Sequence, residues 1–364
     1  CATQQSTTAC RWRVSFKLQF IGSHMRVAVL GAGSFGTVLA DIAAHNGCDV
    51  RIYARRPELC YAVNQFHQNP QYHPDLELHA DIQAFDRIQE TVADADLILL
   101  SVPSKAMQAV CEELSSTIDP HVALLSTTKG LQADGFKLMS QVIETHCPHN
   151  PIGVLSGPNL AHEIAKRHLT ASVVASKEPA VRELARNAFA TKYFRLYSSE
   201  DLISVELGGA LKNIYAIAAG LADGLGVGEN TKALLITRAL AEMSRLSSQM
   251  GGNPLSFLGL AGVGDLFVTS VSPLSRNFRV GRALADGLDL EEAQSRLGQV
   301  AEGVNTLQLV HQQCVEAGIA MPILDALYQV IFGGRPVRQT ALQMMQAAHT
   351  SDVEFLMPDK QPAL

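Results

Sequence analysis

The chain has 364 residues, of which 47% are hydrophobic and 18% charged, and its formal net charge is -6. This balance is typical of a soluble globular protein and excludes a disordered or fibrous chain. An acidic chain without a cluster of five or more basic residues lacks the positive surface of a nucleic-acid binder, and apolar runs such as LILLSV are too short to span a bilayer. We therefore expect no nucleic-acid partner and no stable membrane insertion.

The seven cysteines are scattered without a C-x-x-C pair, which argues against a disulfide framework and favours a reducing, cytoplasmic compartment. Near the start, GSHM at 22–25 reads like a vector-derived scar. We treat residues 1–24 as a leader outside the fold, with a targeting peptide as the alternative.

From residue 26 the sequence alternates short β-rich runs with helical patterns, which predicts βαβ units. The expected strands are RVAVL, DVRIYA, DLILLSV, VALLST, IGVLSG and ASVVAS. After about residue 198 the apolar residues recur at helical spacing. The predicted fold class is an α/β Rossmann-type N-terminal domain with a parallel-rich sheet over 25–203, an all-α C-terminal domain over 204–350, and a loose tail over 351–364.

The first expected strand is followed at once by G-x-G-x-x-G, formed by Gly31, Gly33 and Gly36, and then by a helical pattern. In this context the three glycines permit a tight turn, close approach of a pyrophosphate and packing of the helix on the strand. The pattern predicts a dinucleotide site. The alternative is a glycine-rich turn without a ligand.

The second expected strand ends without the acid that would bind a ribose 2′-hydroxyl. Instead Ala54 is followed by Arg55 and Arg56, which suit a 2′-phosphate. This favours NADPH over NADH. Two arginines on a surface turn, or an enzyme that uses both cofactors, remain alternatives.

Two later strand ends carry polar residues, and ligands gather at the carboxyl ends of strands in such sheets. Lys129 follows VALLSTT and is placed to meet an anionic or carbonyl-bearing substrate, although a solvated lysine is the simpler alternative. The segment Ser156-Gly157-Pro158-Asn159 follows the next strand, either as a ligand-binding turn or as a plain connection.

In the helical half, Lys212 and Asn213 interrupt an apolar helix. Burial disfavours the charge of a lysine and lowers its pKa, so Lys212 is the candidate general acid and base, unless it extends its ammonium to water. Further on, a glycine-rich turn with Asp265 is followed by the trio Ser275, Arg276 and Asn277. An arginine flanked by Ser and Asn suits phosphate oxygens, with a helix N-cap at Ser275 as the alternative. The histidines lack metal-ligand spacing, so we expect no metal.

These segments resemble the NAD(P)-dependent glycerol-3-phosphate dehydrogenase family in its bacterial form. The motifs GAGSFGTVLA, STTKGL, SGPNLAHE, ELGGALKNIYAIAAGLADGLG, LITRALAEMSRL, GLAGVGDLFVT, SRNFRVG and GQVAEG occur in the family's order between Met25 and about Ala348. The cofactor contacts that the resemblance implies are Ser34, Phe35, Arg55, Arg56, Lys129, Ala161, Arg276, Val300 and Glu302. The implied substrate contacts are Lys129, Gly157, Asn159, Lys212, Asp265, Ser275, Arg276 and Asn277.

The resemblance also implies the reaction, which is reversible reduction of dihydroxyacetone phosphate to sn-glycerol 3-phosphate for glycerophospholipid synthesis. Lys212 matches the proton acceptor, and a homodimer is expected because family members are commonly dimers. Asn159 departs from the family, which usually has Ser or Thr there. The alternatives are a β-hydroxyacid or 6-phosphogluconate-type dehydrogenase and a non-catalytic NADPH-binding sensor.

Overall fold

The computed structural model describes residues 25–296 and 301–345. The expected leader over 1–24, the expected tail over 351–364 and Val300 lie outside the described residues.

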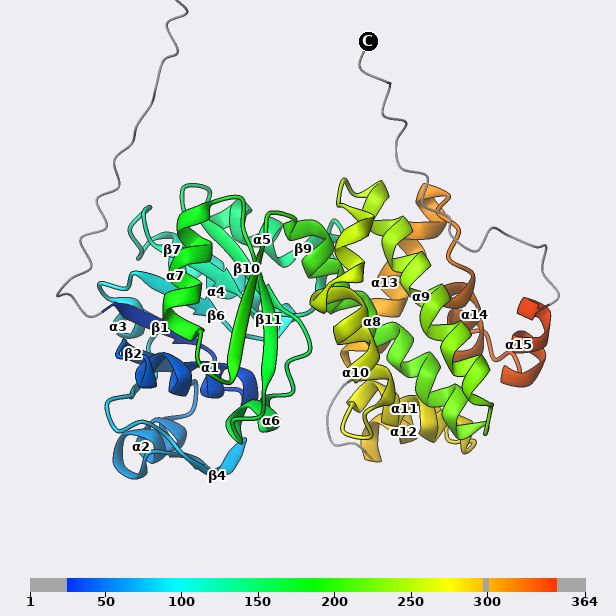
Figure 1. The fold of residues 1–364 in the computed structure, drawn as a ribbon, viewed down its shortest axis with the longest axis horizontal. Helices are drawn as coiled ribbons and strands as arrows, with labels where there is room; N and C mark the ends of the chain where they lie inside the picture. The colour runs from blue at the N-terminus through cyan, green and yellow to red at the C-terminus, as the bar shows by residue number, and fades with distance from the viewer. Residues whose placement is uncertain (1–24, 297–300, 346–364) are drawn as a thin grey trace, which may run out of the picture.

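The N-terminal half is built on one eight-stranded sheet (Figure 1). In spatial order its strands are β12 (Phe194–Ser199), β11 (Thr170–Ala175), β10 (Ile152–Ser156), β7 (Ala123–Ser126), β6 (Leu97–Leu100), β1 (Arg26–Leu30), β2 (Asp49–Tyr53) and β5 (Gln83–Phe85). All six strands expected from the sequence form, within a residue or two of the expected limits. The two edge strands, β5 and β12, were not expected, because one has three residues and the other is half exposed.

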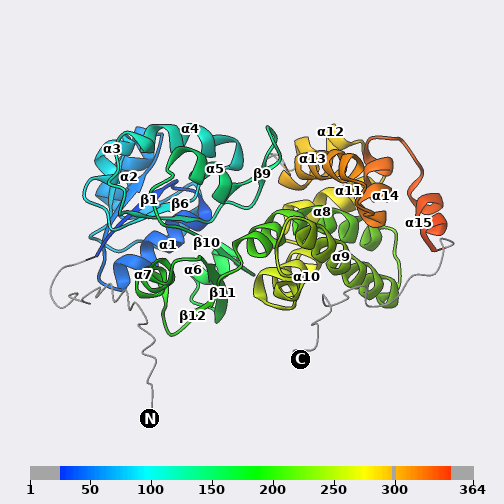
Figure 2. The same ribbon diagram turned by 90° about the horizontal axis from the view of Figure 1, so that it is seen from above.

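Helices cover both faces of this sheet, which explains why its central strands are apolar on both sides. In β1, Val27 and Val29 pack with one face while Ala28 and Leu30 pack with the other. Figure 2 shows the two layers. One contains α1 (Ser34–His45), α6 (Ala161–Ala165) and α7 (Pro179–Phe189), and the other contains α3 (Ile88–Val92), α4 (Ser104–Ser115) and α5 (Met139–His146). Helix α2 (Pro57–Phe66) follows β2.

The sheet is parallel-rich, as predicted, but β10 and β11 run antiparallel. The connection between them contains only the five-residue helix α6. A parallel return needs a full crossover along the face of the sheet, whereas an antiparallel return does not. The sequence pattern showed a strand on each side of this connection but carried no sign of its direction.

Two small hairpins stand apart from the main sheet. One pairs β3 (Gln68–Asn69) with β4 (His73–Glu77), and the other pairs β8 (Leu131–Gln132) with β9 (Lys137–Leu138). Leu131 and Leu138 of the second hairpin belong to the hydrophobic core of the helical half. This hairpin therefore joins the two halves of the molecule.

The C-terminal half consists of helices packed around α8 (Leu202–Gly224), as Figure 1 shows. The others are α9 (Glu229–Gln249), α10 (Asp265–Val271), α11 (Arg276–Ala285), α12 (Leu290–Arg296), α13 (Glu302–Ala317), α14 (Pro322–Ile331) and α15 (Val337–Met345), with a 3₁₀ turn at Pro254–Leu258 and a π-helical turn at Leu260–Gly264. By length and composition α8 is apolar enough to cross a membrane, and 83% of its most apolar window is buried inside the protein.

Helices α8 and α11 approach so closely that their backbones touch. A Cβ at Gly220 would collide with the Phe278 carbonyl oxygen, and one at Gly281 would collide with the Ile217 carbonyl oxygen. Backbone atoms cannot move aside as a flexible side chain can, so both positions require glycine.

Gly220→Ala and Gly281→Ala should each lower the free energy of unfolding by about 1–3 kcal/mol or more, because the added methyl group forces the two helices apart. Urea unfolding followed by circular dichroism measures this. Gly228→Ala is the matched control, since a Cβ there meets nothing within 4 Å and the glycine has a φ of -69°. Equal losses in all three variants would contradict the close-packing argument.

Candidate functional site

The site lies where four neighbouring parallel strands end. β10, β7, β6 and β1 are adjacent in the sheet and point the same way. Their carboxyl ends therefore bring together residues far apart in the sequence, namely Gly31, Ser101, Lys129 and Gly157. This is the edge at which ligands bind in open α/β sheets.

The glycine turn has the backbone that a pyrophosphate site requires. Gly31 has a φ of +122°, and a Cβ there would collide with the Ser101 carbonyl oxygen. A Cβ at Gly36 would collide with the Gly31 carbonyl oxygen, which explains the close packing of α1 on β1. Gly33 differs, since a Cβ there meets nothing within 4 Å, and as N-cap of α1 it offers no side chain to the first helical amides. The open space in front of these amides fits an anionic group.

Two arginines follow β2 at the same edge. Arg55 and Arg56 are exposed and form no ion pair within the described part of the chain. No carboxylate stands at the end of β2, where Ala54 is buried. Phe35, on the first turn of α1, is half-buried against the core of the N-terminal half.

Three charged residues predicted from the sequence meet in one buried cluster. The Lys129 Nζ donates to Asp265 Oδ2 and to the Gly157 carbonyl oxygen, both at 2.8 Å. The Lys212 Nζ donates to the other oxygen of the same carboxylate, Asp265 Oδ1. Asp265 is fully buried and bridges a lysine from the sheet edge to a lysine from α8.

Lys212 is buried, so the alternative in which its ammonium reaches water is wrong. Its side chain is 9% exposed and lies between α8 and α10. Burial lowers the pKa of Lys212 from 10.5 to about 7, and the Asp265 carboxylate acts in the opposite direction by favouring the charged form. A lysine amine with a pKa near 7 can both donate and accept a proton.

Thr269, which was not predicted from the sequence, also contacts this lysine. The Lys212 Nζ also donates to Thr269 Oγ1 at 3.0 Å, and the Thr269 hydroxyl donates to the Asp265 carbonyl oxygen at 2.6 Å. Thr269 stands four residues after Asp265, so both project from one face of α10. That spacing was the signal available in the sequence.

The absence of a side chain at Gly209 lets α8 pack closely against Lys129. A Cβ at Gly209 would lie 2.9 Å from Ser156 Oγ and 3.2 Å from Lys129 Cγ. Around the same turn, Ser156 Oγ and Asn159 Nδ2 are buried without a hydrogen-bond partner among the described residues, while Asn159 Oδ1 accepts from the Ser172 hydroxyl at 2.9 Å. Buried polar atoms usually have partners, so these two are available to a ligand. Ala161 follows as the first residue of α6.

The trio at 275–277 begins α11 and has more than one role. Ser275 is the N-cap, as in the alternative interpretation, because its Oγ accepts from the Phe278 amide at 3.3 Å. Asn277 is buried and links three helices, donating to Asn213 Oδ1 at 2.9 Å and accepting from the Gly303 amide at 3.1 Å.

Arg276 acts on the same buried carboxyl group as the two lysines. Burial raises the pKa of the Glu302 carboxyl group at the start of α13. The positive charges of Arg276, Lys129 and Lys212 oppose this rise without cancelling it. These four residues therefore share one electrostatic environment.

A second buried carboxylate connects the halves of the molecule. Glu206 on α8 accepts from the Ser140 amide at 2.9 Å and from the Ser140 hydroxyl, at the first turn of α5. Burial raises the pKa of Glu206 to about 7. Because Glu206 lies on the helix that carries Lys212, this contact fixes the position of α8 against the sheet.

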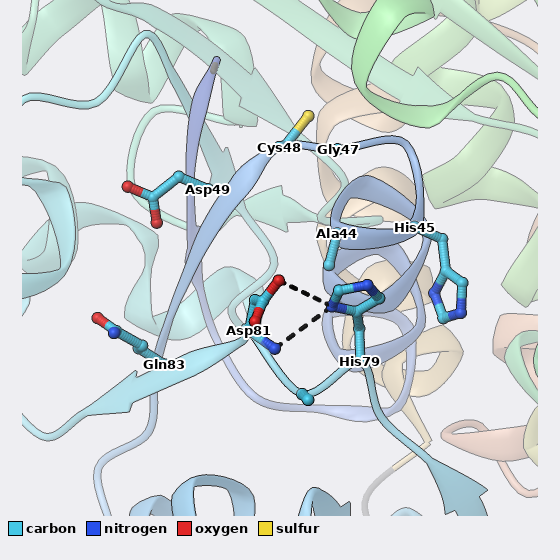
Figure 3. Close-up of a pocket in the computed structure, with 9 residues that line it drawn as sticks. Ala44, His45, Gly47, Cys48, Asp49, His79, Asp81 and Gln83 are labelled. Atoms are coloured by element: carbon cyan, nitrogen blue, oxygen red, sulfur yellow. Dashed lines mark hydrogen bonds and ion pairs between the residues drawn. The ribbon is translucent and has the colours of Figure 1, made fainter. Parts of the chain in front are cut away.

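A pocket of about 620 Å³ lies at the opposite edge of the sheet, where α1 ends and β2 begins (Figure 3). Its lining includes His45, Asp49, His79 and Asp81, and the Asp81 amide donates to His79 Nδ1 at 3.3 Å. None of the residues predicted for the site lines it. Among the described residues, no group of three or more His, Cys, Asp or Glu side chains is arranged to hold a metal ion.

Comparisons with known proteins agree with this arrangement. The sequence model described as NAD-dependent glycerol-3-phosphate dehydrogenase N-terminus matches residues 26–182, and the model of the C-terminus matches residues 201–342. A curated relative from Azotobacter vinelandii, named glycerol-3-phosphate dehydrogenase (NAD(P)+), is 49% identical over 91% of this chain and 97% of its own length.

Solved structures of similar proteins have the same fold. Glycerol-3-phosphate dehydrogenase from Coxiella burnetii is 34% identical with a TM-score of 0.84, covering 89% of this chain and 99% of its own. The enzyme of that name from Saccharomyces cerevisiae is 28% identical with a TM-score of 0.82, covering 88% of this chain and 99% of its own. The chain belongs to the NAD-dependent glycerol-3-phosphate dehydrogenase family.

Proposed function

We propose that this protein reduces dihydroxyacetone phosphate reversibly to sn-glycerol 3-phosphate, with Lys212 as the general acid and base. The observation that carries the proposal is the buried Lys129–Asp265–Lys212 cluster beside a glycine turn whose open space fits a dinucleotide phosphate. A purely dinucleotide-binding sensor would need the turn but not two lysines on one buried carboxylate.

When bound, the reduced nicotinamide supplies the hydride that adds to the C2 carbonyl carbon of the substrate. The carbonyl oxygen then gains negative charge and needs a proton, which protonated Lys212 donates. Thr269 and Asp265 hold the Lys212 Nζ in one position. In the oxidative direction neutral Lys212 takes the proton from the C2 hydroxyl group.

Lys129 contributes fixed positive charge near the same oxygen. Its ammonium is held by Asp265 and by the Gly157 carbonyl oxygen, so it needs little rearrangement as charge develops on the substrate. We place Gly157 and Asn159 at the substrate, because Asn159 Nδ2 is a buried donor without a partner in the described residues.

The substrate phosphate is assigned to the start of α11. Arg276 supplies charge there and the first amides of the helix supply donors. Ser275 and Asn277 hold this helix end, and the second hydrogen of the Asn277 amide group is left for the phosphate. Arg276 and Glu302 are also assigned to the cofactor, together with Ala161 and with Val300, which lies outside the described residues.

We further propose that NADPH is preferred over NADH, and that the enzyme is a cytoplasmic homodimer that supplies glycerophospholipid synthesis. Arg55 and Arg56 support the cofactor preference, since they stand exposed where an acid would select NADH. The five described cysteines are free thiols, in keeping with a reducing compartment. The dimer rests on the family resemblance.

Purified protein mixed with NADPH and dihydroxyacetone phosphate should lower the absorbance of the reduced nicotinamide. Lys212→Ala should reduce kcat by about 10²–10⁴-fold, the usual contribution of general acid catalysis, while NADPH still binds. Lys232→Ala is the matched control, a lysine in the same half that forms ion pairs with Asp223 and Glu229. Absence of oxidation by the unaltered protein would refute the proposed reaction, and retained turnover in Lys212→Ala would refute the role of Lys212.

The pH dependence should have opposite signs in the two directions. Because the pKa of Lys212 is about 7, kcat/KM for reduction should fall as the pH rises through 7, and kcat/KM for oxidation should rise. Asp265→Asn removes the charge that favours the ammonium, so both transitions should move to lower pH. Steady-state rates from pH 5 to 9 measure this, and an unmoved transition in Asp265→Asn would contradict the assignment.

The double variant Arg55→Ala, Arg56→Ala should raise KM for NADPH by about 10–100-fold or more, because it removes at least one charge-assisted hydrogen bond to phosphate, which contributes about 1.5–3 kcal/mol. KM for NADH should change less than about twofold. Arg186→Ala on α7, an exposed arginine paired with Glu183, is the control. Equal losses for both cofactors would mean that these arginines do not contact the 2′-phosphate.

A further inference from the structure

Two buried polar side chains of the β3–β4 hairpin pack against the glycine turn. Asn69 and His73 are paired directly across the hairpin, so their side chains project from the same face. Asn69 is fully buried and His73 is 6% exposed. Neither residue was singled out in the sequence, because they stand more than thirty positions from the turn they contact.

Asn69 fixes the shape of the turn. Its Nδ2 donates to the Ala32 carbonyl oxygen at 3.0 Å and to Thr37 Oγ1 at 2.8 Å. These acceptors lie on either side of Gly33, in the turn and in the first part of α1. The hairpin therefore holds the backbone in front of which a pyrophosphate would bind.

The His73 imidazole forms hydrogen bonds with Ser34, the residue after Gly33. Its Nε2 lies 2.9 Å from the Ser34 carbonyl oxygen and 3.0 Å from Ser34 Oγ. A carbonyl oxygen can only accept, so Nε2 must carry a hydrogen. The Ser34 hydroxyl oxygen then accepts from the same N–H, and its own hydrogen is left to donate elsewhere.

The direction of that hydroxyl matters because it stands at the open end of α1. Gly33 leaves the first helical amides uncovered by any cap side chain. A phosphate oxygen that approaches these amides accepts hydrogen bonds, so a Ser34 hydroxyl turned outward as a donor matches it. A hydroxyl that donated to an unprotonated imidazole would offer such an oxygen only its lone pairs.

We propose that His73 is a positioning residue of the dinucleotide site, which turns the Ser34 hydroxyl outward as a donor to the cofactor pyrophosphate. This rests on the proposed function. His73 does not touch the reacting atoms, so it should affect cofactor affinity and leave the chemical step unchanged.

The test is direct titration of NADPH by fluorescence, without substrate, combined with steady-state kinetics. His73→Leu should weaken NADPH binding by about five- to tenfold, the loss expected for about one hydrogen bond. The kcat at saturating NADPH should stay within about twofold of the unaltered protein. His73→Gln, which places an amide N–H where Nε2 stands, should restore the affinity to within about twofold, and the shorter His73→Asn should not.

A double-mutant cycle with Ser34→Ala separates positioning from general support of the hairpin. If His73 acts through the Ser34 hydroxyl, the double variant should bind NADPH no more weakly than Ser34→Ala alone. Leu76→Ala is the control, a half-buried residue on β4 that packs with the core, and it should lower thermal stability without changing NADPH affinity.

Additive losses in the cycle, unchanged affinity in His73→Leu, or equal weakening by Leu76→Ala would overturn the proposal. If His73→Leu does not fold, the comparison of His73→Gln with His73→Asn decides, and equal affinities would again overturn it. Failure of the unaltered protein to bind NADPH would count against the proposed function instead.

Discussion

The site depends on one buried carboxylate shared by two ammonium groups. Asp265 has no exposed surface, and each of its oxygens accepts from a different lysine. When both lysines are protonated, one negative charge cannot balance two positive charges, and the cluster carries a net positive charge around a carboxylate that is fully buried. An anionic substrate relieves that imbalance, and the competition between burial and Asp265 sets the pKa of Lys212 near 7.

This cluster exists only because three structural elements approach closely. Lys129 comes from the end of β7, Lys212 from the middle of α8 and Asp265 from the start of α10. At position 209 any side chain larger than that of glycine would push Lys129 away. A Cβ at Gly208 would collide with the Ala261 carbonyl oxygen, so this glycine lets the turn before α10 approach α8. Glu206 then ties α8 to the first turn of α5. The glycines and the buried acid of one helix thus fix the position of Lys212.

Local signals were sufficient for much of the fold and part of the site. The six expected strands formed because each is a compact apolar run, and the glycine turn was recognisable because strand, glycines and helix follow one another directly. The same locality explains the omissions. The half-exposed strand β12 and the antiparallel direction of β11 depend on neighbours across the sheet. Thr269 had a helical spacing to Asp265 as its signal, whereas Asn69 and His73 had none.

By itself the sequence determined the family, the dinucleotide turn, the absence of an acid after the second strand and the two lysines as candidates. Each of these depends on residue identity and on spacing along the chain. Only the tertiary structure decided that Lys212 is buried, that both lysines share Asp265, that Asn277 links three helices and that His73 bonds to Ser34. Burial and hydrogen-bond partners are set by residues that are distant in sequence, and a pKa follows from them rather than from the residue type alone.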